Sequence, residues 1–189
     1  MKHCLNKFIR KIYYKKFGNV GIESLIPIKD SKNISGKKNI FVGDYCSIGP
    51  GCYISANNNG KLIIKNGSIL APNVTILTRS HNYNINISKI PFDENYTTAD
   101  VIIDEAVWIG QNAIILPGVH IGKGAVIGAG GVIARSVPEY AICVGNPARI
   151  VGYRDNVTFD KLLYEEAYVN RFRCGKQYIK VKEKASMTI

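Results

Sequence analysis

Histidines are the side chains of this 189-residue chain best suited to take up a proton near neutral pH. His3 lies in a basic N-terminal segment, and His120 has regularly spaced neighbours, which favours an ordinary exposed or interface histidine. His81 differs because it is the last residue before a long polar segment, residues 82–100. Its position admits two interpretations: a general base, or a solvated histidine at a strand end.

The elements that must position His81 follow from a six-residue repeat of aliphatic side chains. An α-helix has a period near 3.6 and a strand a period of 2, so neither explains the repeat. A six-residue repeat is typical of a parallel β-helix, in which each hexapeptide forms one flat side of a triangular coil. We therefore predict an all-β fold, a parallel β-helix of hexapeptide repeats with short N- and C-terminal helices. The repeating positions are Val42, Ile48, Ile54, Ile64, Leu70, Ile76, Ile103, Ile109, Ile115, Ile121, Ile127 and Ile133.

Glycine and asparagine recur three residues after the aliphatic position, where the coil must turn. Both residues accept positive φ at low cost, so they predict sharp corners. The corner set is Gly51, Asn57, Gly67, Asn73, Asn112, Gly118, Gly124 and Gly130. A second set directly follows the aliphatic position and leaves room where coils stack: Gly43, Gly49, Gly110, Gly122 and Gly128.

The repeat divides the chain into three parts. Residues 1–41 are expected to form a basic N-terminal helix, over 2–17, and a lead-in; this helix either caps the first coil, which we favour, or lies on a membrane. Residues 42–152 are the predicted β-helix, with an extruded loop at 82–100 of the kind that is usually functional. Residues 153–189 are expected to form a helix, at 158–172, and a basic tail.

The charge balance restricts the classes of partner. The chain has 25 Lys and Arg against 14 Asp and Glu, a net charge of +11. This excess favours anionic partners, such as a nucleotide-tailed cofactor, an acidic sugar, a lipid-linked phosphate or a membrane surface. Nucleic acid is not expected, because no recognition motif accompanies the charge. No apolar run is long enough to cross a membrane, and the N-terminus does not have the pattern of a secretory signal.

Five cysteines show no metal-ligand spacing, so no metal is expected. Cys46 and Cys52 fall on inward positions, where a free thiol behaves as a small hydrophobic group, and a reducing cytoplasm is the simplest location. The outward positions Ile114, Val126 and Val132 are apolar. They predict a strip at a subunit interface, and a three-sided prism associating in this way closes a ring of three.

One stretch of coil resembles a known family. Residues 71–76 (Ala-Pro-Asn-Val-Thr-Ile), followed by Ser80 and His81, are similar to the active-site coil of hexapeptide-repeat O-acetyltransferases, which include galactoside, maltose and capsule or lipopolysaccharide enzymes. The similarity spans about residues 40–152, with further signature segments at 107–110, 115–119, 127–130 and 144–149. The resemblance implies a left-handed β-helix, a homotrimer with sites between subunits, acetyl-CoA as donor, and His81 as the general base.

The resemblance also assigns residues to the two substrates. Acetyl-CoA would be bound by Trp108, Gln111, Ala129, Ala134, Arg135 and Arg149. The acceptor would be bound by Asn57 and Tyr83. Alternatives stay open: Asn57 as a corner residue, Trp108 as an interface residue, and the arginines as a solvated face. Ala134-Arg135 replaces the family's usual Thr-Lys, so a hydroxyl contact is lost.

We expect an O-acetyltransferase acting on a sugar hydroxyl in surface polysaccharide or lipopolysaccharide synthesis, with an anionic or lipid-linked acceptor as one option. Pro91-Phe92 and the helix after the coils are similar to xenobiotic acetyltransferases, although the Trp-rich helix of that branch is replaced by Tyr164, Tyr168 and Phe172. A xenobiotic acetyltransferase, an amino-sugar N-acetyltransferase and a non-catalytic scaffold are the alternatives. The partner that orients His81 is open among Asp93, Glu94 and a backbone carbonyl.

Overall fold

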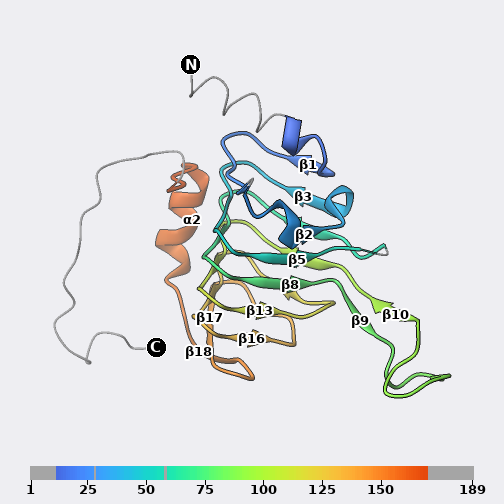
Figure 1. The fold of residues 1–189 in the computed structure, drawn as a ribbon. Coiled ribbons are helices and arrows are strands. Elements are labelled where there is room, and N and C mark those ends of the chain that lie inside the picture. The colour runs from blue at the N-terminus through green and yellow to red at the C-terminus, as the bar shows by residue number, and fades with distance from the viewer. Residues whose placement is uncertain (1–11, 28, 58, 170–189) are drawn as a thin grey trace.

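The computed structural model describes residues 12–27, 29–57 and 59–169, and its centre is a three-sided prism of short strands (Figure 1). The chain passes repeatedly from sheet A to sheet B to sheet C, which form the three sides. Neighbouring coils pair in parallel, and β17–β18 is an antiparallel exception at the C-terminal end. The predicted parallel β-helix is thus confirmed. The N-terminal helix expected at 2–17 lies largely outside the described residues; residues 12–14 are helical.

Each sheet takes one strand from each coil. Sheet A contains β1 (Asn19–Val20), β3 (Ile40–Val42), β6 (Leu62–Ile64), β11 (Val101–Ile103) and β14 (His120–Ile121). Sheet B contains β4 (Ser47–Ile48), β7 (Ile69–Leu70), β12 (Trp108–Ile109), β15 (Val126–Ile127), β17 (Ala141–Val144) and β18 (Arg149–Tyr153). Sheet C contains β2 (Ile34–Ser35), β5 (Tyr53–Ser55), β8 (Thr75–Leu77), β13 (Ile114–Ile115) and β16 (Val132–Ile133). The other elements are β9 (Arg79–His81), β10 (Tyr96–Thr98), the 3-10 helices η1 (Ser31–Asn33) and η2 (Lys37–Asn39), and α2 (Asn156–Tyr164).

The repeating aliphatic side chains point inward and form the core. All twelve are buried, and the strand register stacks them directly: Ile76 pairs with Ile115, and Ile115 with Ile133. Small residues between them, such as Ala113 and Ala125, are fully buried. The core is therefore a column of aliphatic side chains that stabilises each coil only through its neighbours.

Most predicted corners adopt positive φ, but one does not. Asn73 and Asn112 have φ of 60° and 59°, whereas at the corner after β5 the positive φ belongs to Asn59 rather than Asn57. The prediction for Asn57 is wrong because this corner is longer than the others. The stacking glycines behave as expected: a Cβ on Gly110 would lie 2.6 Å from the backbone nitrogen of Ala129.

The ends of the prism differ from the predicted boundaries. Coils begin at β1, upstream of residue 42, because β1 and β2 already pair with β3 and β5. At the other end, the antiparallel hairpin β17–β18 closes the prism in place of a further parallel coil. Helix α2 begins and ends earlier than the predicted 158–172.

Helix α2 packs against sheet B, on the side of the prism away from β9 and β10 (Figure 1). The carboxylate of Asp155 caps it by accepting from Val157 N, and Asp160 accepts from Lys123 Nζ at 3.0 Å and Tyr140 Oη at 2.8 Å. No helix among the described residues is long and apolar enough to cross a bilayer.

The three outward apolar residues do not form one strip. Ile114 and Val132 are paired neighbours on sheet C, whereas Val126 lies on sheet B beside Trp108. The expected contiguous strip is therefore wrong, because successive hexapeptides occupy successive faces of the prism. That the outer face of sheet B or of sheet C contacts another subunit stays a prediction.

Candidate active site

His81 stands at the base of a hairpin that leaves the prism where the chain turns from sheet C to sheet A, which we call the C/A edge (Figure 1). Strands β9 and β10 are antiparallel, and Tyr96 is the direct register partner of His81. The loop between them is organised by the buried Asp93, which accepts from Asn82 Nδ2 at 3.1 Å and Asn95 N at 2.9 Å. Burial would raise the pKa of Asp93, but these hydrogen bonds together hold it below its usual value.

Aromatic rings, rather than a carboxylate, surround the imidazole of His81. Its ring lies 4.0 Å from that of Phe92 and 4.6 Å from that of Tyr96, measured between centroids. Nδ1 is buried and has no hydrogen-bond partner among the described residues. Neither Asp93 nor Glu94 forms a hydrogen bond with His81 in the described structure. Asp93 holds the loop, and Glu94 pairs with Lys89. Packing against Phe92 and Tyr96 therefore fixes the ring plane, a role that the sequence alone did not indicate.

The C/A edge brings two other predicted site residues into line with His81. Asn57 follows β5, one coil before His81, and its side-chain amide donates to Ser35 Oγ at 2.8 Å. Arg135 follows β16, two coils after β8, which corresponds to about 10 Å along the prism. Tyr83 is in the hairpin loop and is 69% exposed. A base, a polar amide and a cation thus share one edge of the prism.

A second group lies on sheet B and on the edge between sheets B and C. Trp108 is in β12, is 52% exposed, and borders a hollow of about 500 Å³ between sheet B and α2, where Phe159 and Leu162 face it. Gln111 and Ala129 occupy successive coils, and Gly130 N donates to Gln111 O at 2.8 Å. These residues do not share an edge with His81 within one chain.

Arg135 and Arg149 line the same hollow at the C-terminal end of the prism. Ala134 and Pro147 also line this hollow, whose volume is about 590 Å³. Neither arginine forms an ion pair with a described carboxylate, so both guanidinium groups are available to an anion. Forked guanidinium donors suit phosphate groups, so the hollow has the chemistry to hold the nucleotide end of a coenzyme A. No group of three or more potential metal ligands occurs in the described residues.

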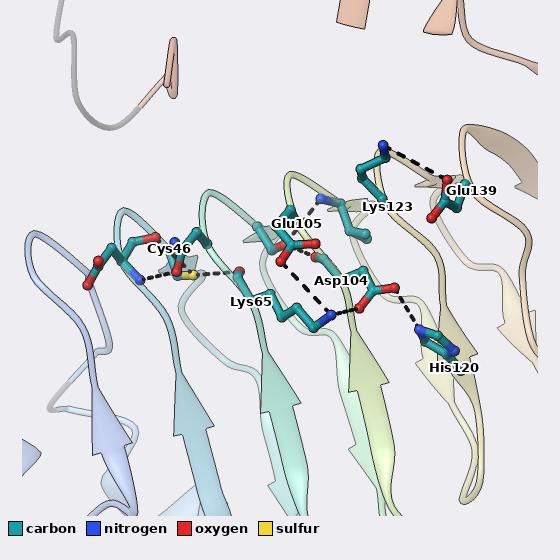
Figure 2. A network of polar contacts seen from close by, with 11 residues as sticks. Cys46, Lys65, Asp104, Glu105, His120, Lys123 and Glu139 are labelled. Atoms are coloured by element: carbon teal, nitrogen blue, oxygen red, sulfur yellow. Dashed lines mark hydrogen bonds and ion pairs between the residues drawn. The ribbon is translucent and has the colours of Figure 1, made fainter. Parts of the chain in front are cut away.

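His120, the other described histidine, belongs to a separate network on sheet A (Figure 2). Asp104 lies between Lys65 and His120 on neighbouring coils, with Lys65 Nζ at 2.6 Å and His120 Nε2 at 2.7 Å. Burial alone would raise the pKa of Asp104, but the bonds from Lys65 and His120 outweigh it and lower the pKa. This network links three coils, and we assign it to stability rather than catalysis.

Replacing Asp104 by Asn should therefore lower the free energy of unfolding at pH 7 by about 2 kcal/mol. Because the carboxyl pKa is lower in the folded state, its contribution is present above about pH 4 and disappears as the pH falls through the folded pKa. Denaturant unfolding of both proteins between pH 7 and pH 3 should show the difference narrowing with acidity. Glu94→Gln, which breaks only an exposed pair with Lys89, is the control and should change stability little. A pH-independent difference would contradict this account.

Comparison with known proteins adds three findings. Residues 100–135 match the family described as "Bacterial transferase hexapeptide (six repeats)". The chain is 31% identical over 140 residues to a galactoside O-acetyltransferase of Lactococcus lactis, covering 72% of this chain and 63% of that protein. It is 36% identical over 125 residues to a chloramphenicol acetyltransferase of Agrobacterium fabrum, covering 63% and 54%. The chain therefore spans less than two thirds of these relatives' own lengths.

Among solved structures, a maltose O-acetyltransferase of Clostridium difficile superimposes with a TM-score of 0.61 at 29% identity, covering 77% of this chain and 74% of that one. The shared architecture is the left-handed parallel β-helix of hexapeptide repeats. The handedness implied by the resemblance is thereby confirmed.

Proposed function

Because this chain belongs to the hexapeptide-repeat acetyltransferase family, we propose that it is an O-acetyltransferase that moves an acetyl group from acetyl-CoA to a sugar hydroxyl. The observation that carries the proposal is the half-buried His81 held between Phe92 and Tyr96. A base in this position is oriented and partly shielded from water, yet it stands on an edge that a substrate can reach. This combination fits a reaction between two bound substrates better than it fits a scaffold.

In the proposed reaction the imidazole of His81 takes the proton of the acceptor hydroxyl as its oxygen attacks the thioester carbon. Backbone N–H groups stabilise the negative charge on the carbonyl oxygen of the tetrahedral intermediate. When the intermediate collapses, the carbon–sulfur bond breaks, the acetyl ester forms, and the departing thiolate receives the proton from His81. No covalent enzyme intermediate is needed, which agrees with the burial of the free thiols of Cys46, Cys52 and Cys143.

The donor would lie along the coils between the two groups of residues. Arg135 and Arg149 would bind its phosphates, and backbone groups at Gln111 and Ala129, with the Trp108 ring, would line the pantetheine arm. Ala134 contributes only its backbone there. Since His81 and Trp108 lie on different sides of one chain, the complete site needs two copies.

A homotrimer supplies the second copy in this proposal. The hairpin loop exposes Ile85, Ile87 and Ile90, which are 65%, 38% and 89% exposed, and sheet B exposes Trp108 on another side. A contact between unlike surfaces repeats around an axis and can close a ring of three. The loop of one subunit would then meet the Trp108 side of the next, with His81 between them.

The acceptor is proposed to be a sugar of a surface polysaccharide or lipopolysaccharide, anionic or lipid-linked, bound through Asn57 and Tyr83. The reaction would take place in the cytoplasm, where acetyl-CoA is available. The similarity to a chloramphenicol acetyltransferase favours a second candidate, a xenobiotic acetyltransferase. Both candidates use the same base and donor and differ in the acceptor.

An acceptor screen tests the proposal. The full chain would be incubated with acetyl-CoA and a panel of sugars, nucleotide sugars, amino sugars and antibiotics, and free thiol from released coenzyme A would be measured. We expect turnover with a sugar and an O-acetyl ester as product. Turnover with antibiotics alone would favour the second candidate, an N-acetyl product would identify an amino-sugar enzyme, and no turnover with any acceptor would contradict the enzyme assignment.

A further inference from the structure

The positive charge of the described chain is concentrated at the N-terminal end of the prism. In the described chain, residues 12–41 contain six Lys and two Asp and Glu, whereas residues 42–169 contain nine basic and eleven acidic residues. The body of the prism is therefore slightly acidic, and its N-terminal end is strongly basic. We propose that this basic end docks on the surface of an anionic lipid bilayer.

The described part of this end presents its charges at the first coil. Strands β1 and β2 are the edge strands of sheets A and C. The lysines lie before β1, just before and within η1, and within η2. Five of them are exposed and form no ion pair with any described residue: Lys15, Lys16, Lys29, Lys32 and Lys38. Lys37 is half-buried, and its pKa is lowered by burial and by the nearby Lys16.

The neighbouring carboxylates do little to offset these charges. Asp30 accepts a hydrogen bond from Gly51 N at 2.8 Å, and Asp44 accepts one from Ile22 N at 2.8 Å; neither forms an ion pair with a lysine among the described residues. Glu23 is the other acidic residue of the first 41 positions. The exposed lysines are thus free to meet negative charge outside the molecule.

The chemistry of the surface favours a bilayer over a soluble polyanion. Its described cations are lysines, compact charges that suit a diffuse negative surface, whereas the arginines that suit a defined phosphate lie at the other end of the prism. Aliphatic side chains accompany the lysines: Ile22 is 63% exposed and Ile12 is 50% exposed. Charge together with insertable apolar groups is the combination that holds a protein at a lipid interface.

The location also leaves the proposed active site accessible. The first coil and the strands β16 to β18 lie at opposite ends of the prism (Figure 1). A bilayer against the first coil would leave the hollow at Arg135 and Arg149 facing the solvent. Docking does not depend on the acetyl transfer, and it would bring a lipid-linked acceptor to the enzyme if the acceptor is of that kind.

Vesicle sedimentation of the full chain tests the proposal. We expect binding to vesicles of phosphatidylcholine with phosphatidylglycerol, weak binding to phosphatidylcholine alone, and release at high salt. Each lysine removed should weaken binding about fivefold, so Lys15→Gln, Lys29→Gln and Lys32→Gln together should weaken it about 100-fold. The matched control replaces three exposed lysines elsewhere, Lys61, Lys89 and Lys161, by Gln and should bind as the parent does.

Two further measurements separate the possible outcomes. Ile22→Asn, which keeps every charge, should also weaken vesicle binding but should leave binding to soluble dextran sulfate unchanged. Acetyl transfer to a soluble acceptor should be retained by the Lys15, Lys29 and Lys32 variant, which shows that the fold is intact. Three outcomes would each overturn the proposal. The first is equal binding to neutral and anionic vesicles, and the second is an equal loss of vesicle binding in the two triple variants. The third is binding to dextran sulfate without binding to vesicles.

Discussion

Replacing His81 by Ala should lower kcat for acetyl transfer by about 10²- to 10⁴-fold, because the acceptor hydroxyl then loses the base that takes its proton. The KM for acetyl-CoA should change little, since the residues assigned to the donor do not include His81 and the nearest of them on the C/A edge, Arg135, lies two coils away. Steady-state release of coenzyme A, measured with the acceptor found in the screen, gives both parameters. A thermal unfolding curve of the variant shows whether the loss comes from chemistry or from misfolding.

The matched control for His81 is His120, the other described histidine. Its imidazole bonds to Asp104, and we assign it to the network on sheet A. His120→Ala should lower the unfolding temperature slightly, because Asp104 keeps its bond to Lys65. It should leave kcat within a factor of about 3, because His120 lies on sheet A, away from the residues assigned to acetyl transfer. If His81→Ala retained the parental rate, or if both variants lost it equally, the catalytic assignment of His81 would be wrong.

Sequence reasoning predicted the repeating core well and its first coil poorly. From Ile103 to Ile133 the six-residue spacing is uninterrupted, so each inward position could be identified. Two buried inward residues of the first coil, Ile26 and Ile34, are eight residues apart because η1 lies between them. An inserted 3-10 turn removes the period without removing the coil. A lengthened corner after β5 likewise places the positive φ at Asn59 rather than at Asn57.

The candidate site was also predictable only where it adjoins the six-residue repeat. His81 stands out because the repeat ends beside it, and the resemblance of residues 71–81 to the acetyltransferase coil implies that it is the base; both signals are local in the sequence. Phe92 and Tyr96 were not identified as its neighbours because they reach it through the register of a hairpin outside the repeat. No six-residue pattern specifies that register, which depends on the loop contacts of Asp93.

Replacing Ile115 by Ala should destabilise the protein by about 2–5 kcal/mol, because it opens a cavity inside the aliphatic column. Ile115 is fully buried and is stacked between Ile76 and Ile133. A cavity at this point weakens the contacts of the coils on both sides, and each coil depends on its neighbours for burial. Denaturant unfolding at a fixed protein concentration measures the effect, since subunit assembly adds to apparent stability.

The adjacent residue provides a control of the same type in the same strand. Ile114 points outward from sheet C and is half-buried in the single chain, so Ile114→Ala should cost about 1 kcal/mol or less there. If this face meets another subunit, the variant should instead weaken assembly, which sedimentation velocity would detect as a shift toward monomer. The two substitutions should differ in destabilisation because the Ile115 side chain points into the core and the Ile114 side chain points out of it. Equal destabilisation by the two substitutions would contradict the inward position of Ile115 and with it the register of the whole column.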